Sequence, residues 1–298
     1  MRAPRRVPIP MRFEISYESE YRYSRPVAGN FNRLRMKPTS GDLQRLEHFD
    51  VRIEPVQLIH RYVDLFGNDV VELLVATRHQ RLQMEIDALV ATTQPIPAPQ
   101  APRAALRSDR YRAMAGPYIY HPEPEIPDLG ALARDLAGDS PAETTALVMT
   151  GLRERFSYDA AATTVTSTVT DFLAARGGVC QDFAHLALML LREQDIAARY
   201  VSGYFYTVRE DAGPDAASAE VQTHAWVEAL LPVSGDGEPV WFAIDPTNGI
   251  LAGEHHVKIG HGRMYSDVPP IEGTFAGDAE TEIDAHVTMT RVDSGPLA

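Results

Sequence analysis

The chain has 298 residues, of which 44% are hydrophobic and 23% are charged, and its formal net charge is −13. This composition is typical of a globular protein long enough for two domains, and an acidic balance argues against nucleic acid as a partner. No run of about 18 apolar residues occurs, so neither a transmembrane helix nor a membrane partner is expected. The single cysteine excludes an intrachain disulfide framework and a zinc ribbon.

The first ten residues contain three arginines and three prolines. A secretory signal would continue with 7–15 apolar residues, whereas Arg12 and Glu14 follow here. We therefore expect residues 1–10 to form a disordered leader and the protein to be cytoplasmic.

Hydrophobic and polar residues alternate in the next section of the chain. Phe13, Ile15 and Tyr17 would all lie on one face of a strand. Similar runs recur as far as residue 90, and the Gly-Asn pair at 67–68 predicts a tight turn between two of them. Residues 11–92 are therefore predicted to form an antiparallel β-sandwich-like domain.

Four prolines then follow within eight residues, at positions 95, 97, 99 and 102. Such spacing favours a semi-rigid extended chain, so residues 93–110 are predicted to be a linker.

The remaining residues, 111–298, show helical periodicity first and strand periodicity afterwards. Ser140-Pro141-Ala142-Glu143 is a capping box, which predicts a helix through about residue 155. A strongly amphipathic helix is predicted over 180–194. Strand-like runs follow at 198–207, 223–231 and 240–244, and residues 283–292 form a last strand that can join either sheet. This order predicts an α+β core.

A glycine pair at 177–178 leads into Cys180, which begins the amphipathic helix. Free backbone amides and the helix dipole stabilise negative charge there, and therefore favour the nucleophilic thiolate. The glycines allow a substrate to approach the backbone closely. A lone cysteine is otherwise a small buried hydrophobic residue, so both interpretations are open from this segment alone.

A thiol nucleophile needs a base, and the base needs a group that orients it. His224 lies in the predicted strand 223–231, with Trp226 on the same face. Asp245 ends the next strand, because Pro246 stops it. Adjacent strands lie about 5 Å apart, so Asp245 can hydrogen-bond His224 and stabilise its imidazolium form.

Three segments resemble the bacterial transglutaminase-like superfamily, in the order Cys, His, Asp. They are Gly-Gly-Val-Cys-Gln-Asp-Phe-Ala-His at 177–185, Thr-His-Ala-Trp-Val-Glu at 223–228 and Asp-Pro-Thr-Asn at 245–248. The N-terminal region is similar to the β domain of bacterial members, and residues 262–273 are similar to the family's C-terminal signature. The resemblance covers about residues 11–292. It implies a transglutaminase-like cysteine protease with a papain-like core, expected within residues 111–298.

The resemblance also implies the chemistry. Cys180 is the nucleophile, His224 acts as base and then as acid, and Asp245 orients His224. A peptide or glutamine side-chain amide of a protein or peptide substrate would be converted to a thioester, which is hydrolysed. Hydrolysis is favoured because water is always available, whereas crosslinking requires a site that excludes it. A protein-crosslinking transglutaminase and a non-catalytic peptide-binding module on the same fold are the alternatives.

Four further residues are candidates for substrate binding. Gln181 would line the site, while Asp182 would contact substrate or support the helix start. Trp226 would form a wall of the substrate channel or pack in the core. Tyr158 is a candidate for the second oxyanion donor, beside the backbone amide of Cys180.

No metal and no cofactor are expected. His255, His256 and His261 are close in sequence, but no acidic or cysteine ligand stands at a convincing zinc spacing. Glycine-rich phosphate loops and EF-hand calcium loops are missing from the sequence. The oligomeric state is left open.

Overall fold

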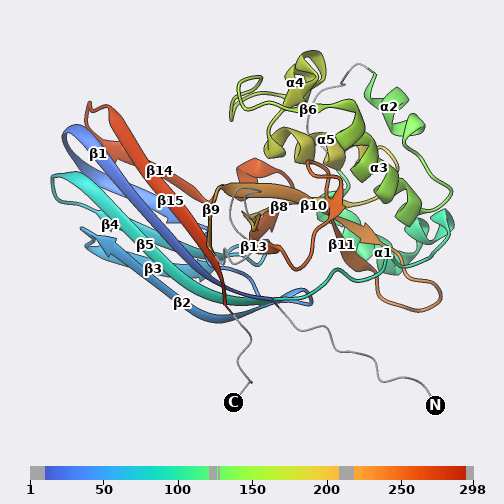
Figure 1. The fold of residues 1–298 in the computed structure, drawn as a ribbon, viewed down its shortest axis with the longest axis horizontal. Helices are drawn as coiled ribbons and strands as arrows, with labels where there is room; N and C mark the ends of the chain where they lie inside the picture. The colour runs from blue at the N-terminus through green and yellow to red at the C-terminus, as the bar shows by residue number, and fades with distance from the viewer. Residues whose placement is uncertain (1–10, 121–125, 127, 208–217, 293–298) are drawn as a thin grey trace.

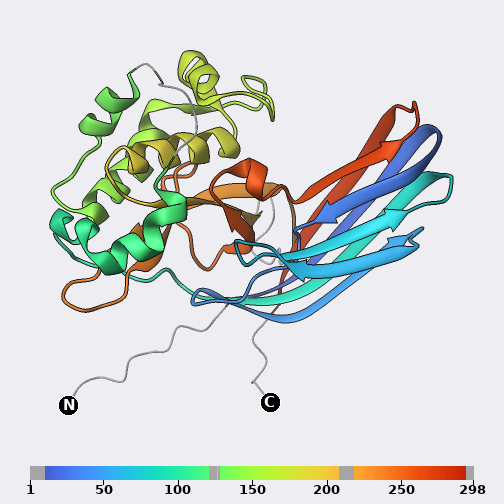
Figure 2. The same cartoon turned by 180° about the vertical axis from the view of Figure 1, so that it is seen from behind.

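The computed structural model describes residues 11–120, 126, 128–207 and 218–292. The predicted leader, residues 1–10, lies outside this part of the chain. A curled antiparallel sheet stands beside a body of helices and a second sheet, as the front and back views show (Figures 1 and 2). None of the helices in the described residues is long and apolar enough to cross a membrane.

Eight strands form the first sheet, with β2, β5, β1, β15 and β9 in that order, β4 and β14 also paired with β1, and β3 paired with β4. Their bounds are β1 Met11–Leu34, β2 Gln44–Glu54, β3 Leu58–Val63, β4 Asp69–Val75, β5 His79–Thr92, β9 Ser218–Val221, β14 Ile271–Ala276 and β15 Thr281–Val292.

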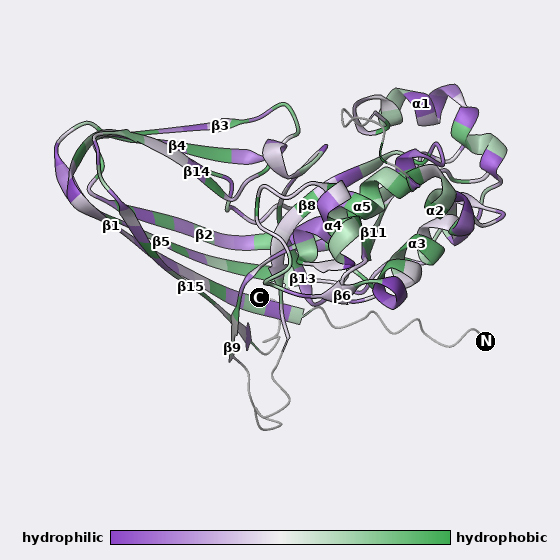
Figure 3. Ribbon diagram, turned by 90° about the horizontal axis from the view of Figure 1, so that it is seen from above, coloured by the Kyte–Doolittle hydropathy of each residue, from purple (hydrophilic) through white to green (hydrophobic). Residues whose placement is uncertain are grey.

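The length of β1, 24 residues, explains the curl of this sheet. Residues 12–23 pair with β5 and β15, whereas residues 28–34 pair with β4 and β14. The pairing register of the strand shifts between Ala28 and Phe31, where Gly29 adopts a φ of 55° that only glycine takes freely. One strand therefore serves two layers, and hydrophobic residues alternate with hydrophilic ones along it (Figure 3). The sandwich-like character predicted from the sequence is confirmed.

The second sheet is antiparallel, in the order β12, β11, β10, β8, β13. Its strands are β8 Ala198–Phe205, β10 Thr223–Leu231, β11 Val240–Asp245, β12 Ile250–Leu251 and β13 His256–Gly262, and a short parallel pair joins β6 Ser157–Tyr158 to β7 Gly177–Gly178. The helices are α1 Asp109–Ala115, α2 Leu129–Asp135, α3 Pro141–Arg155, α4 Val169–Ala175 and α5 Cys180–Arg192, with 3-10 turns at Arg103–Arg107, Gly116–Tyr118 and Tyr265–Asp267.

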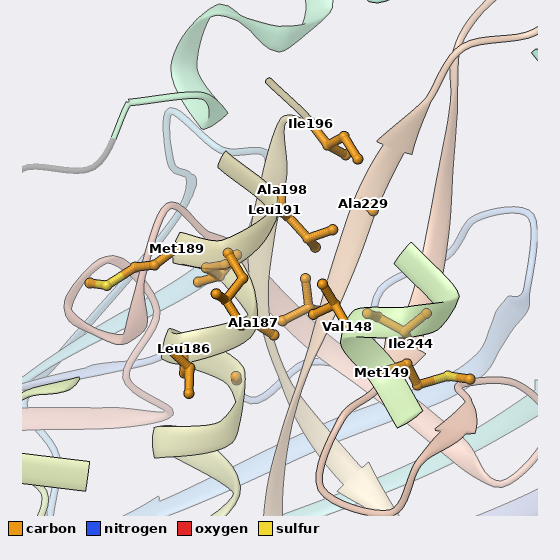
Figure 4. Packing of buried hydrophobic residues seen from close by; sticks show 14 of the residues in the cluster. Val148, Met149, Leu186, Ala187, Met189, Leu191, Ile196, Ala198, Ala229 and Ile244 are labelled. Carbon is orange, nitrogen blue, oxygen red and sulfur yellow. The ribbon is translucent and has the colours of Figure 1, made fainter. Parts of the chain in front are cut away.

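Helix α5 is the centre of the helical layer. It contacts β10 and β8 on one side and α2, α3 and α4 on the others. Leu186, Met189 and Leu191 of α5 belong to the same buried cluster as Val148 and Met149 of α3 (Figure 4). Because α5 is held on all sides, its first residue has a fixed position.

The predicted start of α3 is confirmed in its main feature. The Ser140 hydroxyl accepts a hydrogen bond from the Glu143 amide at 3.1 Å, and Pro141 occupies the first helical position. The Glu143 carboxylate accepts a hydrogen bond from the amide of Asp139. In a regular capping box the donor would be the amide of the cap residue itself, Ser140.

The two bodies share a hydrophobic core. Phe13 and Ile15 of the first sheet are buried in one cluster with Tyr204 of β8 and with Val257 and Ile259 of β13. The faces of the two sheets are thereby packed against each other, and the groups that both sheets contribute to a site are held in register.

Two features differ from the organisation expected from sequence. Strands β14 and β15, residues 271–292, pair with β1, so the range 111–298 expected for the core includes strands that complete the first sheet. The expected linker 93–110 contains a 3-10 turn and the first residues of α1. Arg103 anchors that turn by donating to the Thr144 hydroxyl and to the carbonyl of Gln194, contacts that no local pattern reveals.

Candidate active site

Cys180 is the first residue of α5, a helix of 13 residues, and its side chain is partly exposed. The carboxylate of Asp182 accepts hydrogen bonds from the amide of Val179 at 2.9 Å and from the hydroxyl of Thr163 at 2.6 Å. A Cβ atom on Gly178 would lie 2.4 Å from Asp182 Oδ2, so any other residue there would have to displace this carboxylate. These contacts fix the turn that presents the thiol.

His224 lies near the beginning of β10, and Asp245 is the last residue of the neighbouring strand β11. His224 Nε2 is 2.8 Å from Asp245 Oδ2, and the carboxylate is fully buried. The hydrogen bond expected between adjacent strands is therefore present. With Nε2 engaged by Asp245, Nδ1 is the imidazole nitrogen that is free to take a proton from a thiol.

Asp245 has more partners than the sequence suggests. Its Oδ2 atom also accepts hydrogen bonds from His256 Nε2, at 3.2 Å, and from the Asn248 side-chain amide, at 2.7 Å. Its Oδ1 atom accepts the backbone amides of Thr247 and Asn248. Sequence reasoning assigned no orienting role to His256 or Asn248. The short Asp-Pro-Thr-Asn turn was a signal for Asn248, whereas His256 comes from β13.

The charges of these groups support one another. Burial favours a neutral carboxyl, but the hydrogen bonds from His224 and His256 outweigh it and lower the pKa of Asp245. Burial would likewise lower the pKa of His224, but its hydrogen bonds with Asp245 and Cys180, and their negative charges, raise it to about 10. The buried carboxylate of Asp245 thus stabilises the protonated form of His224.

A cavity of about 450 Å³ surrounds Cys180 and His224. Tyr17 of β1, Met36 in the segment that follows β1, and Ile271 of β14 contribute to its wall. Tyr158 and Val165 line it as well, with 56% and 62% of their surface exposed. The cavity therefore lies between the two bodies and opens to solvent.

The other predicted site residues are divided between this cavity and its surroundings. Gln181 lines the cavity and donates to the carbonyl of Val165 at 3.0 Å. Tyr158 lines it too, and burial together with the charge of Cys180 raises its pKa. Asp182 is buried and supports the helix start instead. Trp226 is buried beside His224 and His256 and lines a different cavity.

Within the described part of the chain, His224, Asp245 and His256 form one group with ligand atoms close enough to share a metal ion. The two imidazole Nε2 atoms are already directed at Asp245 Oδ2, so a metal would have to replace both hydrogen bonds. The three histidines considered from sequence do not gather. His261 contacts Arg199, while the side chain of His255 is 44% exposed.

Comparison with known proteins identifies the family. Residues 13–91 match the bacterial transglutaminase-like N-terminal region, and residues 130–246 match the transglutaminase-like superfamily. An uncharacterized protein of Mycobacterium leprae is 30% identical over 287 residues, which cover 94% of this chain and 99% of that protein. The chain belongs to the transglutaminase-like superfamily. The resemblance drawn from its Cys, His and Asp segments is thereby confirmed.

Further similar proteins extend the comparison. An uncharacterized Mycobacterium tuberculosis protein is 31% identical over 301 residues, which cover 96% of this chain and 95% of that protein. A Pseudomonas aeruginosa protein-glutamine gamma-glutamyltransferase is 32% identical over 172 residues, which are 55% of this chain but 23% of that enzyme. A solved structure from Cytophaga hutchinsonii, described as a candidate cysteine protease, has a TM-score of 0.70 at 20% identity and covers 97% of this chain and 93% of its own. Its likeness confirms the α+β fold, and the family match over residues 130–246 identifies the transglutaminase-like core within it.

Proposed function

We propose that this superfamily member is a thiol-dependent acyl-transfer enzyme that acts on peptide or glutamine side-chain amides. The observation that carries the proposal is the hydrogen bond from buried Asp245 to His224, which lines the same cavity as Cys180. A nucleophile, a base and an orienting carboxylate in this order are the requirements for covalent catalysis by cysteine.

The proposed reaction has two halves. The Cys180 thiolate attacks the amide carbonyl, the C–N bond breaks, and the His224 imidazolium gives its proton to the leaving amine or ammonia. A thioester remains on Cys180. Water then loses a proton to His224 and attacks the thioester, the C–S bond breaks, and the acid is released, so that the Cys180 thiolate and the protonated His224 are restored. The backbone amide of Cys180 is the proposed donor to the developing oxyanion, with Tyr158 as the proposed second donor.

Hydrolysis is the favoured outcome. Transfer to a second amine requires a site that keeps water away from the thioester. Tyr158 and Val165 at the cavity are more than half exposed, so water has access to it. Crosslinking is kept as the second candidate because a Pseudomonas aeruginosa relative is named a protein-glutamine gamma-glutamyltransferase.

The partner proposed for this site is a protein or peptide, without a cofactor. The position of the cavity between both bodies supports this, since the first sheet can contact the parts of a chain that flank the reacting amide. A cytoplasmic location and the exclusion of nucleic acid and membrane partners are further predictions from the sequence.

Mass spectrometry of a glutamine-containing peptide library, with and without a primary amine, tests the proposal. Wild type and Cys180→Ala are compared, with folding checked by circular dichroism. We expect cleaved or deamidated peptides in the wild type alone. Amine adducts that depend on Cys180 would favour the crosslinking enzyme. A library left unchanged by both proteins, but bound by both, would favour the non-catalytic peptide-binding module.

A further inference from the structure

A second cavity, also of about 450 Å³, lies on the face of the second sheet that is turned away from α5. Alternate residues of β10 show this. Ala225 and Val227 belong to the core cluster around α5, whereas Trp226 and Glu228 line the cavity. The opposite wall includes residues 39–43 of the connection between β1 and β2, together with Gln44, the first residue of β2. The acyl-transfer mechanism makes no use of this space.

Two cations meet one carboxylate at this cavity. Glu228 Oε2 accepts hydrogen bonds from Lys258 Nζ, at 2.6 Å, and from Arg199 Nε. All three side chains line the cavity and are between 10% and 14% exposed. One negative charge therefore faces two positive charges with little water around them.

His261 is neutral, so it does not change the charge balance of this cluster. Its Nε2 atom lies 3.1 Å from Arg199 Nη1, which can only donate, so Nε2 is the acceptor. Its Nδ1 atom then carries the proton, and this buried atom has no hydrogen-bond partner among the described residues. Asp42, the other acidic residue of the lining, is exposed at the edge of the cavity.

The buried cluster thus has one excess positive charge and one unused N–H donor. Uncompensated buried charge is costly, and an anion in the cavity would remove the imbalance. A carboxylate matches the remaining donors of Lys258 and Arg199.

The rest of the lining selects the body of the ligand. Trp226, Ala243 and Ala252 form an apolar cluster with Leu43, and all four line the cavity. Trp241 adds a second indole, with the Arg199 guanidinium 4.0 Å from its ring centroid. We propose that this cavity is a binding site for a small carboxylate with an apolar body.

Such a carboxylate has two possible sources, a free carboxylic acid or the C-terminus of a peptide. The site lies next to the proposed triad, because His256 lines this cavity and also contacts Asp245. Binding itself depends only on the cavity, so it can be tested whether or not Cys180 is active.

The chain offers a convenient reporter, because its only two tryptophans both line this cavity. Hexanoate and the neutral hexanamide are titrated into the wild-type protein, with affinity from calorimetry and location from tryptophan fluorescence. We expect hexanoate to bind at least about tenfold more tightly than hexanamide and to change the fluorescence. A dipeptide with a free carboxyl group and its amidated form are titrated in parallel. Preference for the free acid of the dipeptide over hexanoate assigns the site to a peptide C-terminus, and the reverse order assigns it to a free acid.

Lys258→Met removes one cation and should weaken hexanoate binding about tenfold. Lys37→Met is the matched control, because Lys37, the other lysine of the chain, pairs with Asp69 outside the cavity. It should leave the affinity unchanged. Equal affinities for hexanoate and hexanamide in the wild type, or no binding of either, overturn the proposal even if Lys258→Met does not fold.

Discussion

His256 Nε2 lies 3.2 Å from Asp245 Oδ2, the same oxygen atom that His224 contacts. The amide of Gly253 faces His256 Nδ1 at 3.3 Å, so Nδ1 is an acceptor and Nε2 carries the proton. Burial lowers the pKa of His256, which keeps the imidazole neutral. His256 is therefore a positioning residue that donates to the carboxylate behind His224.

The first prediction concerns this donor. His256→Ala should lower kcat about tenfold while KM changes little, because Asp245 loses a hydrogen bond and holds His224 less firmly. Loss of this donor also raises the pKa of Asp245, so the acid limb of the activity profile should move to higher pH. His256→Gln supplies an amide donor and should restore part of kcat.

His255→Ala is the matched control, since its side chain is 44% exposed one position earlier in the chain. It should leave kcat and the pH profile unchanged. A His256→Ala enzyme with the wild-type profile would show that the second histidine has no part in positioning Asp245.

The second prediction concerns pH and stability. The pKa of His224 is raised from 6.5 to about 10 in the folded protein, by Asp245 and Cys180 against the opposing effect of burial. The resulting stabilisation is fully present below pH 6.5 and is lost as the pH rises through about 10. The free energy of unfolding, measured by urea titration, should therefore fall by roughly a few kcal/mol as the pH rises from 6 to 10.5.

Asp245→Asn removes the carboxylate charge that raises the pKa of His224. The decline over this pH range should become much smaller in the variant, whatever its overall stability. Contributions from other groups, such as Lys258, are common to both proteins and cancel in the comparison. Parallel pH curves for the two proteins would contradict the assigned pairing.

The sequence predicts those parts of the site that depend on neighbouring strands and on one helix end. His224 and Asp245 lie on adjacent strands and meet as expected. His256 could not be predicted as their partner, because it approaches from β13 on the other side of β8, across strands that are not consecutive. Trp226 lies on the same face of β10 as His224, as its spacing requires. Its side chain nevertheless lines the second cavity and not the cavity around Cys180.

The same limit applies to the fold. Alternation predicted strands between residues 11 and 90 and over residues 283–292, but it did not predict β9 or β14. Periodicity also does not say which sheet a strand joins. β9 shows this clearly, since it pairs with β15 of the first sheet and is followed by β10 of the second after the single residue Gln222. Such crossings depend on which hydrophobic faces meet in space, here Tyr204 and Val257 against Phe13.

The third prediction concerns the packing that holds α5 in place. Leu152 of α3 is fully buried in the cluster around α5, whereas Leu147 of the same helix is 37% exposed. Leu152→Ala should lower the free energy of unfolding by about 2–5 kcal/mol, because it leaves a cavity. Leu147→Ala should cost about 1 kcal/mol or less. Chemical denaturation measures both, and equal losses would contradict the packing of α3 against α5.

The fourth prediction concerns the turn before the nucleophile. An added Cβ on Gly178 would lie 2.4 Å from Asp182 Oδ2 and 2.8 Å from the ring of Phe172, which is fully buried. Gly178→Ala must therefore displace the carboxylate that accepts the Val179 amide and supports the start of α5. We expect a loss of about 1–3 kcal/mol in unfolding free energy and slower alkylation of Cys180 by iodoacetamide.

Gly116→Ala is the matched control, because nothing lies within 4 Å of the added methyl group and the backbone there is right-handed helical. It should change the unfolding free energy by about 0.5 kcal/mol or less and leave the alkylation rate unchanged. Alkylation measured by mass spectrometry in native buffer separates the two effects, since a protein that is merely less stable but correctly folded keeps the wild-type rate. A Gly178→Ala protein with the wild-type alkylation rate would therefore show that the turn does not govern the reactivity of Cys180.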